Sequence, residues 1–250
     1  MNRTYIESRR NPLLVHLHKL LTSRSYREKC GQFAAEGTKL LEEAAKWYPA
    51  LDTVVVQQGV ELCPLPAHVR VAEVSEALMR AISQQDAPQG AAFICALPQP
   101  REARVQAGSI LLDGIQDPGN LGTILRTADA LSVPVVLLDG CADAYSPKTV
   151  RASMGAVLRT QPQRMTREQA LESCRAQGIP MLATAMTARA KDLRQAALAE
   201  AAVVIGSEGQ GVSSLLLETA DESVIIPMAS RCESLNAAIA AAIVMWQMKQ

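Results

Sequence analysis

Three short polar stretches of this chain follow apolar runs and carry side chains that can do chemistry. The first is Asp117-Pro118-Gly119-Asn120, with Arg126 shortly after it. The second is Gly206-Ser207-Glu208, and the third is Ser234-Leu235-Asn236. Ligands of α/β proteins bind beyond the carboxyl ends of parallel strands, so we expect these stretches to form one site.

The second stretch lacks the features of a phosphate-binding loop. Gly206 and Gly211 have the glycine spacing of a P-loop, but Val212 stands where the phosphate-binding lysine belongs. Glu208 adds a carboxylate, which repels phosphate. The stretch therefore suits a ligand without phosphate groups, and the alternative is a plain strand-to-helix turn.

Each polar residue also has a purely local interpretation. Asn120 and Ser234 are both suitable N-caps for the helices that follow them. Arg126 falls on the second turn of its expected helix, where a lone arginine is usually a surface ion pair. Only their joint occurrence at three strand ends favours a site.

The amino-acid composition and the cysteine spacing predict a folded protein without a metal centre. The 250 residues carry 25 basic and 25 acidic side chains, and 48% are hydrophobic. We find no membrane-length apolar run and no signal peptide, so we expect a cytoplasmic protein. The six cysteines form no CxxC pair and the three histidines complete no zinc spacing, so we expect free thiols and no metal.

Basic residues gather in two parts of the neutral chain. Residues 1–30 carry seven arginines and lysines against two glutamates, and residues 148–164 carry four more basic side chains. Local patches of this kind attract phosphate whatever the total charge. The alternative is ordinary solvated helix faces.

The chain divides at a proline-rich linker, residues 98–107, into a small α/β unit (1–97) and a larger α/β domain (108–250). In the first we expect helices at 12–21, 38–47 and from residue 75, with strands at 33–36, 52–57 and 91–97. In the second, strands at 109–113, 134–138, 180–184, 202–206 and 223–227 alternate with helices at 121–131, 147–154, 166–177, 211–219 and 235–249. This alternation predicts a parallel sheet covered on both faces.

The polar blocks resemble those of the SpoU (TrmH-type) RNA 2′-O-ribose methyltransferases. The resemblance covers Asp117–Gly122 with Arg126, Ile205–Gly209 with Gly211, and Ile226-Pro227-Met228 followed by Ser234-Leu235-Asn236. Ser146–Ala156 also resembles a stretch of this family, and Phe33 with Glu36-Gly37 resembles the small substrate-binding domain often fused ahead of it.

The resemblance implies a trefoil knot (SPOUT-like) in the C-terminal domain, which departs from the usual absence of knots. It also implies a homodimer, for which the Ala-rich last helix is suitable, and S-adenosylmethionine as cofactor. The implied cofactor residues are Thr184, Gly206, Ile226, Met228 and Leu235. The implied catalytic residues are Asn120, Arg126, Glu208, Ser234 and Asn236.

The implied reaction is attack of a ribose 2′-hydroxyl on the sulfonium methyl group. A guanidinium is nearly always protonated, so we expect Arg126 to stabilise the alkoxide or hold a phosphate rather than act as the base. We expect Asn120 to orient the ribose or Arg126, and Glu208 to fix Arg126 or a loop amide. Ser234 and Asn236 would shape the knot and contact the nucleotide.

The N-terminal domain would bind structured RNA through contacts to its phosphates and through the shape of the folded RNA. The expected substrate is rRNA, with no membrane partner. The alternatives are a tRNA 2′-O-methyltransferase, a base methyltransferase and a catalytically inactive RNA-binding member of the fold.

Overall fold

The computed structural model describes residues 3–99, 102–187, 189–229, 231–232 and 234–250. The chain forms two units. Unit 1 comprises residues 1–99 and 145–159, and unit 2 comprises residues 100–144 and 160–250. The segment 145–159 lies within the range that the sequence suggests for the second domain, yet it packs with unit 1.

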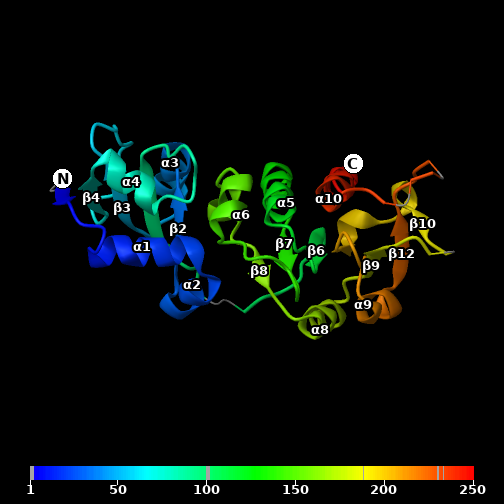
Figure 1. Ribbon diagram of the computed structural model, residues 1–250. Helices are drawn as coiled ribbons and strands as arrows, with labels where there is room; N and C mark the ends of the chain where they lie inside the picture. The colour runs from blue at the N-terminus through cyan, green and yellow to red at the C-terminus, as the bar shows by residue number, and fades with distance from the viewer. Residues whose placement is uncertain (1–2, 100–101, 188, 230, 233) are drawn as a thin grey trace. The chain divides into compact units, whose positions relative to one another are not determined.

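Unit 1 is built on a mixed five-stranded sheet in the order β1-β4-β3-β5-β2, with β5 antiparallel to both neighbours. Its strands are β1 (Arg3–Ile6), β2 (Gln32–Glu36), β3 (Leu51–Gln57), β4 (Arg70–Val74) and β5 (Ala91–Ala96). Its helices are α1 (Pro12–Thr22), α2 (Arg24–Cys30), α3 (Thr38–Trp47), α4 (Glu76–Ile82) and α6 (Pro147–Ala152) (Figure 1).

The helical spacing of leucines in α1 explains the core of unit 1. Leu14, Leu17, Leu20 and Leu21 are all buried, and Asn11 caps the helix ahead of Pro12. On another part of the unit, Tyr145 from the inserted segment lies against Phe33, with ring centroids 4.9 Å apart. The inserted segment therefore contributes aromatic packing to unit 1.

Unit 2 contains an entirely parallel seven-stranded sheet in the order β10-β12-β9-β11-β6-β7-β8, which confirms the predicted parallel α/β class. Its strands are β6 (Ser109–Asp113), β7 (Val135–Leu137), β8 (Gln163–Arg164), β9 (Met181–Thr184), β10 (Lys191–Asp192), β11 (Ala202–Gly206) and β12 (Glu222–Ile225). Its α-helices are α5 (Pro118–Leu131), α8 (Arg167–Gln177), α9 (Ser214–Thr219) and α10 (Ala237–Gln247).

Short elements complete the chain: two 3₁₀ turns, Leu193–Gln195 and Leu198–Glu200, and α7 (Ala156–Thr160), which spans the boundary between the units.

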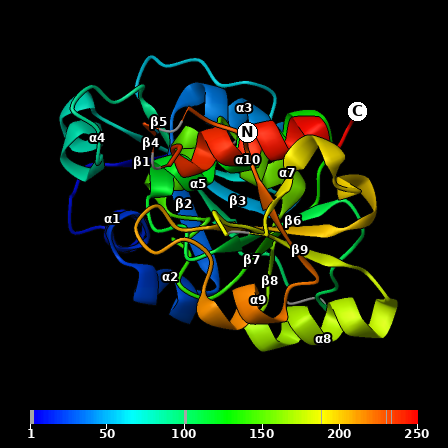
Figure 2. The same ribbon diagram turned by 90° about the vertical axis from the view of Figure 1, so that its right-hand side faces the viewer.

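In unit 2, α5 and α10 lie on one face of the sheet and α8 and α9 on the other (Figure 2). Buried residues of β6, β7, β9 and β11 pack with α8 and α9 in one core. Both faces are covered, as near-continuously apolar strands require.

The structure corrects several predicted boundaries and adds elements. The helix expected at 121 begins at Pro118, which is suited to the first helical turn. The helix expected at 211 begins at Ser214, because Gly211 is bonded to Ser207 in an isolated bridge. The strands β1, β4, β8 and β10 and the helices α2 and α7 were not predicted; each has seven residues or fewer and a weak apolar pattern.

Candidate functional site

Three of the predicted catalytic residues come together in unit 2 as a chain of side-chain hydrogen bonds. Asn236 Nδ2 donates to Asn120 Oδ1 over 3.0 Å, and Asn120 Nδ2 donates to Glu208 Oε1 over 2.5 Å. These bonds join residues 116 and 88 positions apart. One residue from each polar stretch therefore takes part, as the expectation of a single site requires.

The side chain of Asn120 is available for this network because another residue caps its helix. Asp117 is the N-cap of α5, and its Oδ1 accepts from the backbone N–H of Asn120 over 2.8 Å. The interpretation of Asn120 as the cap was therefore wrong. Because Asp117 satisfies the backbone, the amide of Asn120 is left for tertiary contacts.

Asn236, rather than Ser234, is the N-cap of α10. Its Oδ1 accepts from the backbone N–H groups of Ala238 (2.9 Å) and Ile239 (3.3 Å), while its Nδ2 donates to Asn120. The capping interpretation of Ser234 was wrong, and its side chain is exposed. Both ends of the Asn236 amide are used, so its orientation is defined by the network.

The turn that carries Glu208 is closed by its own backbone. Ser207 and Gly211 exchange two N–H···O bonds of 3.0 Å, and Ser207 Oγ accepts from the N–H of Gln210 over 3.2 Å. A Cβ atom at Gly206 would lie 2.1 Å from the carbonyl carbon of Gly211. Only glycine therefore allows the turn to fold back at this point.

A buried carboxylate supports the same turn, a role that no local sequence pattern indicates. Asp113, only 2% exposed, ends β6 and accepts from the backbone N–H of Ser213 over 2.8 Å. Its other oxygen accepts from Arg167 Nε over 2.7 Å. The carboxylate is thus paired and hydrogen-bonded, and it ties the chain beyond Gly211 to β6 and α8.

Arg126 lies in the third turn of α5, not the second as expected, because the helix begins earlier. Its side chain is exposed, and it makes no hydrogen bond or ion pair with any residue in the described part of the chain. The expectation that Glu208 fixes Arg126 is not met, since Glu208 contacts Asn120 instead. The guanidinium is therefore available to an anionic ligand.

A pocket of about 440 Å³ opens beside the network. Its walls include Asn120, Glu208 and Asp117, together with Gln116 and Gln210. Gln116 and Gln210 were not among the predicted site residues. Carboxylates and amides make this pocket a site for hydrogen-bond donors and polar groups, not for phosphate.

The residues expected to hold the cofactor lie at the ends of adjacent strands. Thr184 ends β9, and its Oγ1 donates to the carbonyl of Val204 over 2.8 Å. Gly206 ends β11, next to β9 in the sheet. Ile226 and Met228 follow β12, which flanks β9 on the other side, and Leu235 precedes α10.

This edge of the sheet fits S-adenosylmethionine. Ile226, Met228 and Leu235 are partly buried apolar side chains that can flank an adenine ring. Gly206 allows the turn after β11 to close tightly against Gly211 at this edge. The cofactor carries no phosphate, in agreement with the missing P-loop lysine.

In the described part of the chain, no group of three or more His, Cys, Asp or Glu residues is arranged to hold a metal ion. None of the helices described is both long and apolar enough for a membrane span.

Comparisons with known proteins identify the family of this chain. Residues 108–246 match the SpoU rRNA Methylase family, and residues 11–92 match the MRM3-like substrate binding domain. The chain is 32% identical, over 98% of both sequences, to the 23S rRNA (guanosine(2553)-2'-O)-methyltransferase RlmP of Bacillus subtilis.

Two solved structures have the same arrangement and contain the cofactor. The AdoMet-bound rRNA methyltransferase from Sinorhizobium meliloti is 30% identical, with a TM-score of 0.85, over 98% of this chain and 97% of that one. The SpoU methyltransferase AviRb from Streptomyces viridochromogenes, in complex with AdoMet, is 25% identical, with a TM-score of 0.81, over 96% and 97%. The chain belongs to the SpoU family of S-adenosylmethionine-dependent RNA methyltransferases.

Proposed function

We propose that this protein methylates a ribose 2′-hydroxyl in structured rRNA. The observation that carries the proposal is the Asn236–Asn120–Glu208 network at the strand ends. Arg126, which has no partner among the described residues, lies on the same helix as Asn120. The similarity to the 23S rRNA 2'-O-methyltransferase RlmP along almost the whole chain favours rRNA over tRNA.

Each residue of the site has a defined task in this proposal. S-adenosylmethionine, when bound, supplies the electrophilic methyl group. Arg126 stabilises the negative charge that develops on the 2′-oxygen, or holds the adjacent phosphate. Asn120 is held by its two neighbours and orients the ribose, so that attack occurs in line.

Glu208 contributes an acceptor. Its Oε1 is held by Asn120, and no described residue donates a hydrogen bond to its Oε2. That oxygen can accept a proton or a hydrogen bond from the ribose hydroxyl. Asn236 positions Asn120, and the exposed Ser234 contacts the nucleotide.

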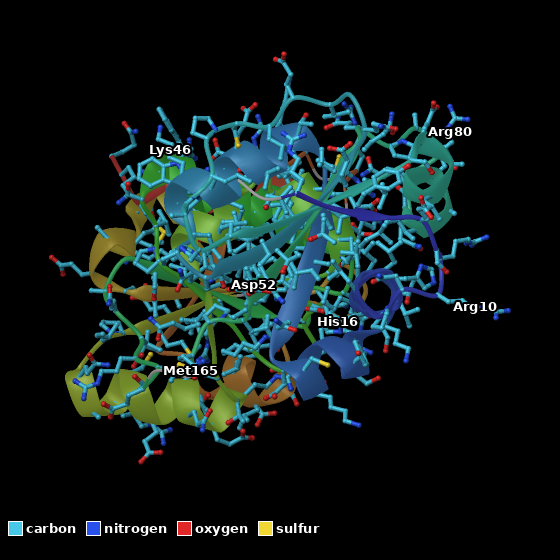
Figure 3. The ribbon with its side chains drawn as sticks, turned by 90° about the vertical axis from the view of Figure 1, so that its left-hand side faces the viewer. Arg10, His16, Lys46, Asp52, Arg80 and Met165 are labelled. Atoms are coloured by element: carbon cyan, nitrogen blue, oxygen red, sulfur yellow. The ribbon has the colours of Figure 1, made fainter. Side chains whose placement is uncertain are left out.

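Unit 1 holds the RNA in this proposal. The turn before α1 carries exposed Arg9 and Arg10, and Arg10 projects away from the unit (Figure 3). Exposed Lys19 and Lys29 add positive charge on α1 and α2. Such a surface binds the RNA backbone by charge and shape, without reading bases.

The proposal includes a homodimer formed through α10. Ile239, Ile243 and Trp246 recur at helical spacing and are 53%, 38% and 61% exposed. On its other side α10 packs against α5, the helix of Asn120 and Arg126. A dimer through this stripe would place a second subunit close to the site. We also propose a C-terminal trefoil knot and a cytoplasmic location.

The test is to incubate the protein with labelled S-adenosylmethionine and unmodified 23S rRNA or tRNA transcripts, and to identify the product nucleoside by mass spectrometry. We expect methyl transfer to 23S rRNA, with the added mass on the ribose fragment. Methylation of the base fragment would contradict the proposed chemistry, and transfer to tRNA alone would contradict the proposed substrate. Cofactor binding without transfer to either RNA would favour an inactive RNA-binding protein.

A further inference from the structure

The side chain of Met186 is unusually exposed for an apolar residue of this protein. It is 62% exposed, the highest value among the large hydrophobic side chains of the described residues. A single exposed apolar residue is common and needs no explanation by itself. The exposure of Met186 is informative because this residue closely follows β9, a strand at the proposed cofactor site.

Met186 lies two residues beyond the end of β9, the strand between β11 and β12, and both of those strands lead to proposed cofactor residues. Ala183 of β9 pairs with Val204 of β11, and Thr184 pairs with Val224 of β12. If both registers continued beyond these last pairs, position 186 would be level with Ser207 on one side and Ile226 on the other. Ala185 N–H donates to the carbonyl of Val224 over 3.1 Å, so the chain still follows β12 beyond the end of β9.

The neighbours of Met186 at this edge differ from it in exposure. Ile226 and Leu235 are already partly buried, so they form walls before any ligand arrives. The side chain of Met186 is largely exposed, so a ligand bound beyond the carboxyl ends of β9, β11 and β12 can add contacts to it. A flexible thioether adapts to the shape of a ligand, and its sulfur makes favourable contacts with aromatic rings such as adenine.

We infer that Met186 closes over the adenine of S-adenosylmethionine and becomes buried when the cofactor binds. This inference rests on the proposed cofactor site. It makes Met186 a binding residue whose contribution is contact area, in addition to the backbone groups at Gly206 and the walls at Ile226 and Leu235.

Methionine oxidation tests the inference without any turnover. Dilute hydrogen peroxide converts exposed methionines to sulfoxides, which mass spectrometry quantifies residue by residue. We expect saturating S-adenosylmethionine to slow oxidation of Met186 several-fold. Met154 is a matched control in the same sample, because it is 47% exposed and belongs to unit 1. Its oxidation should not change.

Calorimetric titration of two variants completes the test. We expect Met186→Ala to weaken S-adenosylmethionine binding about fivefold, and Met186→Leu, which restores most of the contact area, to lie between Ala and wild type. Circular dichroism establishes that both variants are folded. Wild-type affinity in Met186→Ala, or unprotected Met186 at saturating cofactor, would overturn the inference and leave the proposed function standing. Absence of any binding by wild type would overturn both.

Discussion

Asn236 donates a hydrogen bond from its side-chain amide to the amide oxygen of Asn120, over 3.0 Å and across 116 positions of sequence. The same Asn236 side chain caps α10 through its oxygen. One residue thus begins the last helix and fixes the amide that in turn contacts Glu208. Helix capping and the geometry of the site are therefore linked through a single side chain.

Two substitutions at Asn236 should separate these roles. Asn236→Asp retains an oxygen for the cap and loses the donor to Asn120, so we expect near wild-type stability and a large loss of turnover. Asn236→Ala loses both, with about 1 kcal/mol of stability from the missing cap. Thermal unfolding and methyl transfer measure the two effects. Full activity in Asn236→Asp would show that the bond to Asn120 has no part in catalysis.

Replacing Arg126 should affect chemistry and leave the cofactor site intact. We expect Arg126→Ala to lower turnover by about 10²- to 10³-fold, because the developing charge loses its stabilising cation. Stability should hardly change, since the exposed side chain has no partner among the described residues. Calorimetry with S-adenosylmethionine is the control, and lost cofactor binding in this variant would mean that the role is misassigned.

Two glycines of one turn provide a matched pair. At Gly206 a Cβ would meet the backbone of Gly211 and Val212 at 2.1 and 2.2 Å, whereas at Gly209 nothing lies within 4 Å. We expect Gly206→Ala to destabilise the protein by about 3 kcal/mol and to abolish cofactor binding. Gly209→Ala should retain both properties. Thermal unfolding and calorimetry decide, and equal behaviour of the two variants would refute the steric explanation.

The stripe on α10 predicts how the proposed dimer can be disrupted. A charge at Trp246, which is 61% exposed, should disfavour a buried interface. We expect Trp246→Glu to sediment as a monomer where wild type sediments as a dimer. Trp47→Glu is the control, because Trp47 is 49% exposed on α3 in unit 1. A dimer that survives Trp246→Glu and dissociates in Trp47→Glu would place the interface elsewhere.

The cysteines should differ sharply in reactivity. Burial raises the pKa of Cys174 to about 11 and also raises the pKa of Cys95 and Cys141. At about pH 8 these thiols stay protonated and unreactive, while exposed Cys232 is accessible. We expect iodoacetamide to label Cys232 first and the three buried thiols only after unfolding. Rapid labelling of Cys174 in the folded protein would contradict this order.

The same shifts set the direction of the pH dependence of stability. A thiol in the unfolded chain has a pKa of about 8.5, whereas the pKa of Cys174 in the folded protein is about 11. The folded state therefore holds its thiol protons to higher pH than the unfolded chain does. The protonated buried thiols make their whole contribution to the free energy of unfolding below about pH 8. This contribution is lost as the pH rises toward 11. Denaturant titrations at neutral and alkaline pH measure the loss.

The class of the fold and the places where chemistry could occur are already evident from local sequence patterns. Apolar runs that alternate with helical patterns predicted the parallel sheet, and polar residues directly after three of those runs marked the site. The predicted helices and strands that carry the site, α5, α10, β6 and β11, are all present in the structure. These features depend on patterns within a few residues, which a single sequence displays.

Which polar groups meet became evident only in the folded chain. Asn120 and Ser234 both looked like caps, yet Asp117 and Asn236 do the capping, and the amide of Asn120 joins Glu208. The packing of the segment 145–159 with unit 1, where Arg159 pairs with Glu43, was likewise hidden. The Asn120–Glu208 and Arg159–Glu43 contacts join residues about a hundred positions apart in the sequence. Which of these distant residues become neighbours depends on the tertiary packing of the chain, and local periodicity does not encode it.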